Sequence, residues 1–257
     1  MRKIINIILV VIIIGCLSII GYKYYNYSKD NKLNSEIQDL QPVINEEGLG
    51  NTDSDDAGNN SSEENDGQDS SYVSNSANED ELKSINSDYK MWIQIENTNI
   101  NYPVVQGSDN DYYLKHNFRK ESNISGTIFV ESANDIDNDK NIILYGHNMR
   151  NGTMFNNITS YKEESFFEAD NRINIIMNNK VYEYEVFSVY AKNVNEIDLA
   201  IGFANTDEFI NYAYNEAEQS LYKKDVNFSE NDNLLTLVTC SYEFTDARTI
   251  VVARRCD

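Results

Sequence analysis

The 257-residue sequence predicts a mainly β domain, a closed or nearly closed barrel decorated by helices, preceded by a membrane anchor and a disordered stalk. Three observations lead to this prediction. An uncharged apolar run begins the chain, an acidic polar stretch follows, and short strand-like runs separated by turns continue to the end. We therefore divide the chain into an anchor (1–29), a stalk (30–78) and a folded domain (79–257).

The first segment is predicted to cross a membrane. Residues 4–22 carry no charge and consist mainly of Ile, Val and Leu, which reaches the lower limit of about 20 residues for a spanning helix. Tyrosines just after the run suit the membrane interface. Arg2 and Lys3 precede it and favour an N-terminus inside the cell, so the folded domain is expected outside.

Two alternatives for this segment are weaker. A cleaved signal peptide would have a shorter apolar region and a small-residue cleavage site, which we do not find. A lipidated Cys16 would be followed by polar residues, whereas the apolar run continues past it. An uncleaved signal anchor is therefore favoured.

The second segment is predicted to be a disordered spacer between the membrane and the folded domain. Between Asn45 and Asn78 it is rich in Asp, Glu, Asn, Ser and Gly, so it cannot bury enough apolar surface to offset the entropy of ordering. Binding to the cell wall or to cations is the alternative. The net charge of −21 argues against binding to nucleic acid.

The elements of the folded domain follow from periodicity and turn residues. Helices are predicted at its start, over Met154–Ala169, and over Thr206–Ser220 with Asn205 or Thr206 as N-cap. The apolar and β-branched runs that predict strands are Met91–Ile95, Asn99–Gln106, Gly126–Val130, Asn141–Tyr145, Ile173–Met177 and Val181–Tyr190.

The C-terminal segment combines a strand pattern with reactive side chains. Two apolar runs, LLTLVTC and RTIVVARR, flank the polar loop SYEFTDA and predict a β-hairpin. Cys240 ends the first strand and Arg248 begins the second, so their side chains would lie about 5 Å apart at Cβ if they are paired. A fixed positive charge there favours the thiolate over the thiol. An ordinary buried cysteine is the alternative.

The two histidines of the chain have different settings. His147 directly follows the apolar run NIILYG, and Gly146 allows a sharp turn that projects the ring from the strand end. His116 lies in DYYLKHNF, where a packed turn and a structural role are expected. A thiol, an imidazole and a guanidinium at strand ends are typical of a cysteine nucleophile, its acid–base partner and an oxyanion stabiliser.

No metal site, cofactor or structural disulfide is expected. Two histidines without matching Cys or carboxylate spacing do not form a recognised metal site. The acidic run 134–139 could hold Ca²⁺, but it lacks the ligand spacing and glycine of a calcium loop. Cys256 is predicted at the opposite end of the hairpin from Cys240, and Cys16 lies in the anchor.

The combination of TLVTC, an Arg at the start of the next strand and YGHNM upstream resembles the sortases. These are membrane-anchored cysteine transpeptidases of Gram-positive cell surfaces. The segments NYPVVQGSDNDYYL, GTIFVE and GTMF, with a helical insert before the Cys strand, resemble class B in particular. The resemblance covers roughly residues 80–256 and implies the sortase type of closed barrel.

The resemblance also implies a mechanism. Cys240 would attack a backbone carbonyl in a C-terminal sorting motif of a secreted protein, while Arg248 stabilises the oxyanion and His147 protonates the leaving amine. An amine of peptidoglycan or its lipid-linked precursor would then accept the acyl group. The positions that it implies for substrate binding are Asn110, Tyr145, Val238, Thr239 and Ser241.

Two departures from the class B pattern affect the choice of sorting motif. Val238 stands where some members have Ser, and the loop from Cys240 to Arg248 is short. The resemblance suggests an N-P-x-T-N or S/P-P-x-T-G type of pentapeptide. The competing functions are a cysteine hydrolase, in which water resolves the same intermediate, and a non-catalytic surface-binding module.

Overall fold

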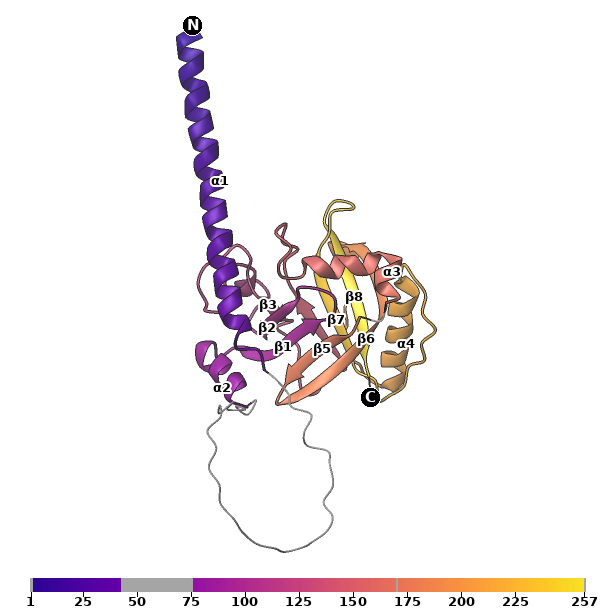
Figure 1. Ribbon diagram of the computed structural model, residues 1–257. Coiled ribbons are helices and arrows are strands. Elements are labelled where there is room, and N and C mark those ends of the chain that lie inside the picture. Colours follow the sequence, from indigo (N-terminus) through magenta and orange to yellow (C-terminus); the bar gives the residue numbers. More distant parts are fainter. Residues whose placement is uncertain (1, 43–75, 170, 257) are drawn as a thin grey trace, which may run out of the picture.

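The computed structural model describes residues 2–42, 76–169 and 171–256. Its centre is a closed β-barrel with the strand order β1-β2-β3-β4-β7-β8-β6-β5 (Figure 1). The strands are β1 (Tyr89–Ile95), β2 (Asn101–Val105), β3 (Ile128–Val130), β4 (Asn141–Tyr145), β5 (Ile173–Met177), β6 (Lys180–Asn193), β7 (Leu234–Cys240) and β8 (Ala247–Arg255). The predicted barrel fold is confirmed.

Alternating side chains of the strands fill the barrel and support the helices outside it. In β1, Met91, Ile93 and Ile95 belong to the central core, whereas Trp92 packs outward into a second cluster. Both faces of the sheet are therefore apolar, which explains why the strands appear as nearly continuous apolar runs in the sequence.

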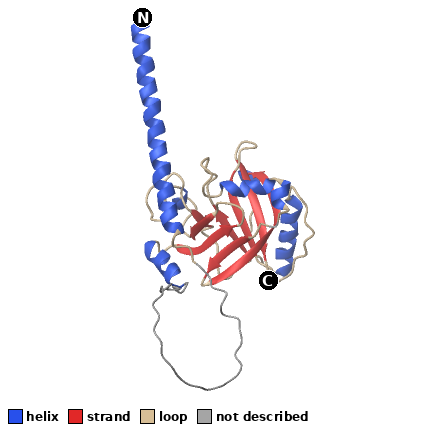
Figure 2. Cartoon of the chain, in the orientation of Figure 1, coloured by secondary structure: helices blue, strands red, loops and turns tan. Residues whose placement is uncertain are grey.

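Helices cover two sides of the barrel (Figure 2). On one side lie α1 (Arg2–Gln38) and α2 (Ser76–Ile85), and on the other lies α4 (Thr206–Gln219). Asn205 is the N-cap of α4, because its side-chain oxygen accepts a hydrogen bond from the Glu208 amide. Short 3₁₀ turns η1 (Tyr112–Leu114) and η3 (Val194–Glu196) lie in the connections.

The single helix predicted over Met154–Ala169 is instead two short ones. The 3₁₀ helix η2 (Asn156–Lys162) and the α-helix α3 (Glu164–Phe167) are separated by Glu163, whose backbone is extended. The cause is local, because the first half is rich in Asn, Thr and Ser, which have low helix propensity. The Thr159 hydroxyl donates to the Asn156 carbonyl, three residues back.

The start of the predicted stalk is wrong, because α1 continues through residues 30–38. Leu33 and Ile37 lie one turn apart on this part of the helix and are 9% and 2% exposed against the barrel. The Asp30 carboxylate is also buried, and it accepts hydrogen bonds from Asn123 and, at 3.0 Å, from Ser125. This amphipathic end of α1 is therefore part of the folded domain.

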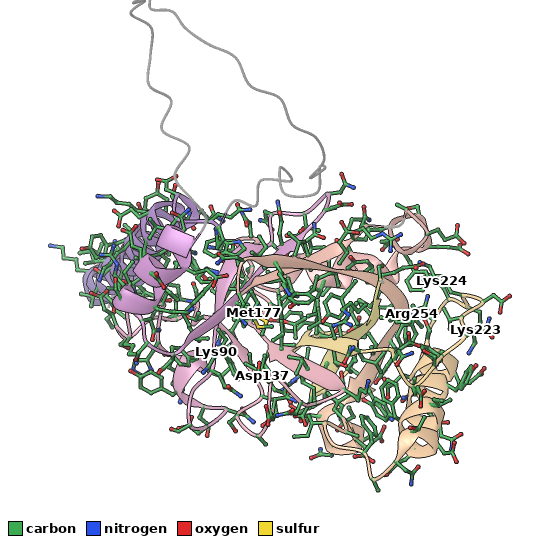
Figure 3. All side chains as sticks on the ribbon, turned by 90° about the horizontal axis from the view of Figure 1, so that it is seen from below. Lys90, Asp137, Met177, Lys223, Lys224 and Arg254 are labelled. Atoms are coloured by element: carbon green, nitrogen blue, oxygen red, sulfur yellow. The ribbon has the colours of Figure 1, made fainter. Side chains whose placement is uncertain are left out.

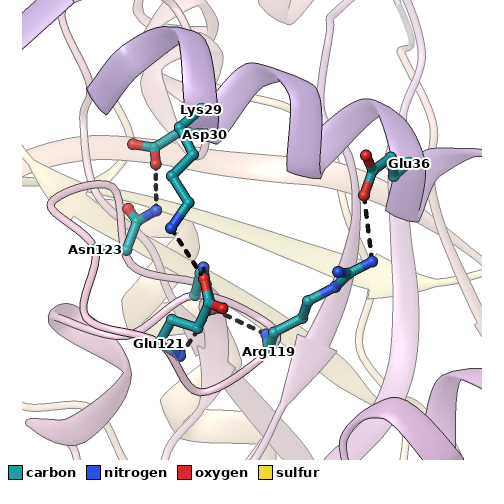
Figure 4. Close-up of polar contacts among 7 residues, drawn as sticks. Lys29, Asp30, Glu36, Arg119, Glu121 and Asn123 are labelled. Atoms are coloured by element: carbon teal, nitrogen blue, oxygen red, sulfur yellow. Dashed lines mark hydrogen bonds and ion pairs between the residues drawn. The ribbon is translucent and has the colours of Figure 1, made fainter. Parts of the chain in front are cut away.

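Ion pairs surround this docked end of α1 (Figure 4). Lys29 Nζ lies 3.3 Å from the Glu121 carboxylate, and Arg119 Nη2 lies 3.2 Å from the Glu36 carboxylate. All four side chains are well exposed, so these pairs add little stability. Burial of side chains stabilises the contact between α1 and the barrel, and the ion pairs orient the helix on that contact.

The residues on either side of the acidic segment lie next to each other. The Asn78 side chain, near the start of α2, donates a 3.1 Å hydrogen bond to the Gln41 carbonyl, just after the end of α1. Leu82 of α2 is fully buried in the same cluster as Leu33 and Ile37. Residues 43–75, which hold most of the predicted stalk, lie outside the described residues. Among the described residues, α1 itself connects the apolar run to the barrel, and the spacer role of 43–75 stays a prediction.

Candidate active site

Strand register brings the three predicted catalytic residues to one rim of the barrel. Cys240 of β7 is the direct partner of Arg248 in β8. The parallel pairing of β4 with β7 places Tyr145 beside Val238. His147 and Cys240 each follow these partners by two residues, so they lie at the same level of the rim.

A pocket of about 370 Å³ opens at this rim. Its lining includes all three candidate catalytic residues and four of the five predicted substrate-binding residues: Asn110, Tyr145, His147, Val238, Thr239, Cys240 and Arg248. Leu114, Phe129 and Gly146 complete the wall. The surface of the pocket is mostly apolar.

The His147 ring is held by the backbone of the 3₁₀ turn η1. Its Nε2 lies 2.8 Å from the Leu114 carbonyl oxygen. A carbonyl oxygen only accepts hydrogen bonds, so Nε2 carries the proton and Nδ1 is the nitrogen that can exchange one. Gly146 is required for this placement, because a Cβ there would lie 2.7 Å from the Phe155 ring.

The backbone of Cys240 is fixed by a residue that the sequence analysis did not identify. Asn148 donates from Nδ2 to the Cys240 carbonyl at 2.8 Å. Its own Oδ1 accepts from the Asn156 side chain at 2.6 Å. These two amides connect the residue after His147 to the end of β7, so they hold the candidate base and nucleophile together.

The Arg248 guanidinium lines the pocket with part of its donor set free. Its Nη1 donates to the Ala247 carbonyl at 3.0 Å, which holds the side chain at the start of β8. A guanidinium carries five N–H donors in a planar fork, so several remain for an oxygen in the pocket. This arrangement can stabilise a developing oxyanion beside the thiol.

Glu131 organises two of the predicted binding residues and was also missed. Its carboxylate accepts hydrogen bonds from Asn110 Nδ2 at 2.6 Å and from the Tyr145 hydroxyl at 3.1 Å. Burial alone would raise the pKa of Glu131, but the hydrogen bonds from Asn110, the Ala133 amide and Tyr145 outweigh it and hold that pKa below its ordinary value. The signal in the sequence was a carboxylate directly after the apolar run GTIFV.

Two of the predicted binding residues have other contacts. The Thr239 hydroxyl donates to the Gly146 carbonyl at 2.7 Å and is buried, so it joins β7 to β4. Ser241 does not line the pocket. Its hydroxyl donates to Glu243 and accepts hydrogen bonds from Lys162 at 3.2 Å and Thr249 at 3.0 Å.

His116 lies in a packed turn, as expected. Its ring stacks on Tyr112 with the centroids 3.9 Å apart, and its Nδ1 lies 2.7 Å from the Tyr112 carbonyl. It does not line the pocket at Cys240.

The opposite rim of the barrel, seen in Figure 3, has two further pockets. One of about 380 Å³ and one of about 520 Å³ share Asp137 and Met177 in their walls. None of the candidate site residues lines them. Across the described residues, no group of three or more His, Cys, Asp or Glu is arranged to hold a metal ion, and this includes the acidic run 134–139.

Comparison with known proteins gives a consistent result. The sequence model of the sortase domain matches residues 93–256. Sortase B of Listeria monocytogenes is 36% identical over 164 residues, which cover 63% of this chain and 67% of that protein. The structure of Clostridium perfringens sortase B is 46% identical, with a TM-score of 0.68 over 70% of this chain and 100% of the other. A complex of Staphylococcus aureus sortase B with a substrate is 32% identical, with a TM-score of 0.65 over 70% and 85%.

Proposed function

Because the chain belongs to the sortase family, in its class B branch, and is a cysteine transpeptidase, we propose that it cleaves a C-terminal sorting motif of secreted proteins through a thioacyl intermediate on Cys240. The observation that carries the proposal is the arrangement of Cys240, His147 and Arg248 around one pocket at one rim. The S. aureus relative has been solved with a substrate, which supports binding of the motif in this pocket.

The proposed reaction has two acyl-transfer steps. The Cys240 thiolate attacks the scissile carbonyl, and the oxyanion that forms is stabilised by the guanidinium of Arg248. The C–N bond then breaks as His147 gives the proton on Nδ1 to the leaving amine. This leaves a thioester on Cys240, which keeps the acyl group activated for transfer.

An amine resolves the thioester in the second step. Its nitrogen attacks the thioester carbon, His147 takes the proton, and the Cys240 sulfur leaves as the C–S bond breaks. The acceptor is an amine of peptidoglycan or of its lipid-linked precursor. The products are a new amide and the free enzyme, with no cofactor consumed.

The N-terminal helix supports a location at the cell membrane. By length and composition, Ile8–Gln38 is a candidate membrane span, and its part from residue 8 to residue 22 carries no charge. With Arg2 and Lys3 inside, the barrel is outside the cell, where secreted proteins and peptidoglycan precursors are available.

The test compares the products formed with and without an amine. The full-length protein in detergent is incubated with a peptide carrying an N-P-x-T-N or S/P-P-x-T-G motif, and the products are weighed by mass spectrometry. We expect the ligated amide when an amine is added and none with Cys240→Ala. A hydrolysed product alone, at every amine concentration, would make the protein a cysteine hydrolase, and no cleavage at all would favour a binding module.

The two histidines provide a matched pair for the same assay. His147→Ala should lower the cleavage rate by about 10²-fold or more, the usual loss of general acid–base catalysis. His116→Gln should leave the rate nearly unchanged, because this ring only stacks on Tyr112. Equal losses in two well-folded variants would contradict the role given to His147.

A further inference from the structure

A second pocket reaches His147 from the side of α1. It has a volume of about 520 Å³ and lies between α1 and the segment 114–124. Tyr22, Asn26 and Lys29 line it from the helix, and Lys115 and Ser122 line it from the domain. We call it the α1 pocket. His147 and Leu114 line both this pocket and the one at Cys240.

The hydrogen bond between His147 and Leu114 lies at the boundary of the two pockets. Cys240 lines only the first pocket, so a chain that binds in the α1 pocket reaches the sulfur by extending past His147 and Leu114. Two substrates could be held at once, one on each side of His147.

The α1 pocket is also close to the end of the apolar run. From Tyr22 to the buried Asp30 the helix is continuous, and eight residues at 1.5 Å each span about 12 Å. Figure 1 shows that the N-terminal part of α1 and the loop between β7 and β8 project toward the same side of the molecule. The pocket thus lies within reach of a molecule anchored in the membrane that α1 is proposed to span.

The charges that line the α1 pocket largely balance. Lys29 and Lys115 are positive, but Lys29 Nζ lies 3.3 Å from the Glu121 carboxylate, and Asp30 adds a negative charge. Both oxygens of the buried Asp30 are bound by Asn123 and Ser125. The carboxylate of the lining is therefore already engaged and does not hold the amine terminus in place as an ammonium ion.

We propose that the α1 pocket receives the acceptor, an amine-terminated peptide carried by a membrane-anchored precursor. The proposal rests on the transpeptidase function given above and names where its second substrate binds. The amine nitrogen bonds to the thioester carbon, its proton passes to His147, and the C–S bond to Cys240 breaks. Water reaches the thioester without this pocket, so hydrolysis does not depend on it.

The test fills the pocket without touching the catalytic residues. Asn26→Trp places a large ring in it from α1. Ser28→Trp is the matched control, because Ser28 is exposed on the same helix and is not part of the lining. The full-length protein is reconstituted in phosphatidylcholine vesicles that contain triglycine joined through its carboxyl group to phosphatidylethanolamine. Free triglycine amide at the same bulk concentration forms the second arm.

We expect Asn26→Trp to lower ligation to the lipid-linked triglycine at least tenfold, while cleavage of the sorting peptide without acceptor stays within twofold of wild type. Ser28→Trp should match wild type in both assays. Unchanged ligation in Asn26→Trp, or an equal loss in Ser28→Trp, would overturn the proposal. Wild-type ligation to free triglycine amide as fast as to the lipid-linked form would overturn the membrane source. Cleavage without any ligation by wild type would overturn the transpeptidase function itself.

Discussion

At the scale of single residues, the role of Arg248 depends on the shape of its side chain as well as on its charge. If Arg248 only favoured the thiolate of Cys240, lysine would replace it. If it holds the oxyanion through its planar fork of donors, lysine cannot. We expect Arg248→Lys and Arg248→Ala both to lower the rate of peptide cleavage by about 10²–10³-fold, the usual loss of one oxyanion donor.

The control for Arg248 is the reactivity of the thiol. The rate at which iodoacetamide alkylates Cys240 should change much less than the cleavage rate in both variants. Near-wild-type turnover of Arg248→Lys would leave Arg248 with an electrostatic role only.

Glu131 is expected to act through Asn110 and Tyr145, without contact with the reacting atoms. Hydrogen bonds to a charged group contribute about 1.5–3 kcal/mol, against about 1 kcal/mol for neutral ones, and 1.4 kcal/mol is tenfold in binding. Glu131→Gln should therefore raise KM for the sorting peptide by about 3–10-fold, with kcat within about twofold. The exposed Glu230→Gln is the control. A loss in kcat at constant KM would contradict this positioning role.

Some residues of the candidate site could be predicted from the sequence and others could not. Cys240, Arg248 and His147 could be predicted because each is a polar residue at the end of an apolar strand. Glu131 and Asn148 could not, because their roles depend on partners 21 and 92 residues away in the chain. Only the closed barrel brings those partners together.

At the scale of elements, α4 makes the stability of the domain depend on pH. Glu216 of α4 is 2% exposed and accepts hydrogen bonds from the Tyr190 hydroxyl at 2.7 Å and from Gln219 at 3.0 Å. Burial raises the pKa of Glu216 above its ordinary value of 4.5. A carboxyl group with a raised pKa in the folded state stabilises the fold below 4.5, and this stability is lost as the pH rises through the folded-state value.

Glu216→Gln should remove this pH dependence of stability, because the glutamine amide does not titrate. It has the shape of the glutamate side chain and can still hydrogen-bond to Tyr190 and Gln219. Measured by urea unfolding, the free energy of unfolding of Glu216→Gln relative to that of wild type should increase from pH 5 to pH 8, because only wild type loses stability over this range. Glu218→Gln, on the exposed side of the same helix, should show no such trend. An equal effect of Glu216→Gln at both pH values would contradict the prediction.

Elements with clear boundaries in the sequence were predicted well. The bounds of β4 and β5 match the prediction. β5 ends at Met177, and Asn178 and Asn179 after it both have positive φ, as a tight hairpin turn requires. Residues 154–169 were predicted as one helix because the spacing of Phe155, Ile158 and Phe167 fits helical contacts. These residues are buried, but a 3₁₀ helix followed by a short α-helix buries them, and their spacing does not distinguish this from one continuous helix.

At the scale of the whole molecule, the acidic segment should be dispensable for folding and cleavage. Its ends are joined through Gln41 and Asn78, so replacing 43–75 by a six-residue Gly-Ser linker preserves both helices. A shorter loop closes with a smaller loss of entropy, which should stabilise the protein by about 1–1.5 kcal/mol. The measurements are urea unfolding and peptide cleavage by the full chain with only this replacement.

The contrasting variant is Ile37→Ala, which leaves the acidic segment intact. Ile37 is 2% exposed, so its truncation should destabilise the docked end of α1 by about 2–5 kcal/mol. If the linker variant folds but no longer cleaves the peptide, the acidic segment has a functional role that its position does not explain.

The boundary between α1 and the stalk could not be predicted from composition. Residues 30–42 are mostly polar. The few apolar ones, such as Leu33 and Ile37, stabilise a helix only where an apolar surface is available to bury them. That surface is built by α2 and by strands β1 to β3, which follow the acidic segment in the chain. Local sequence therefore cannot distinguish this amphipathic end of α1 from the acidic segment that follows it.

The pairing of Cys240 with Arg248 has a consequence for protein engineering. Sheet hydrogen bonds, and not the hairpin loop, set the position of the guanidinium relative to the sulfur. Tyr242 and Phe244 of that loop are 71% and 45% exposed, so they can be randomised while the reactive pair stays in register. Variants at these two positions should therefore fold with the Cys240–Arg248 pair unchanged, which makes this loop a place to insert new sequence.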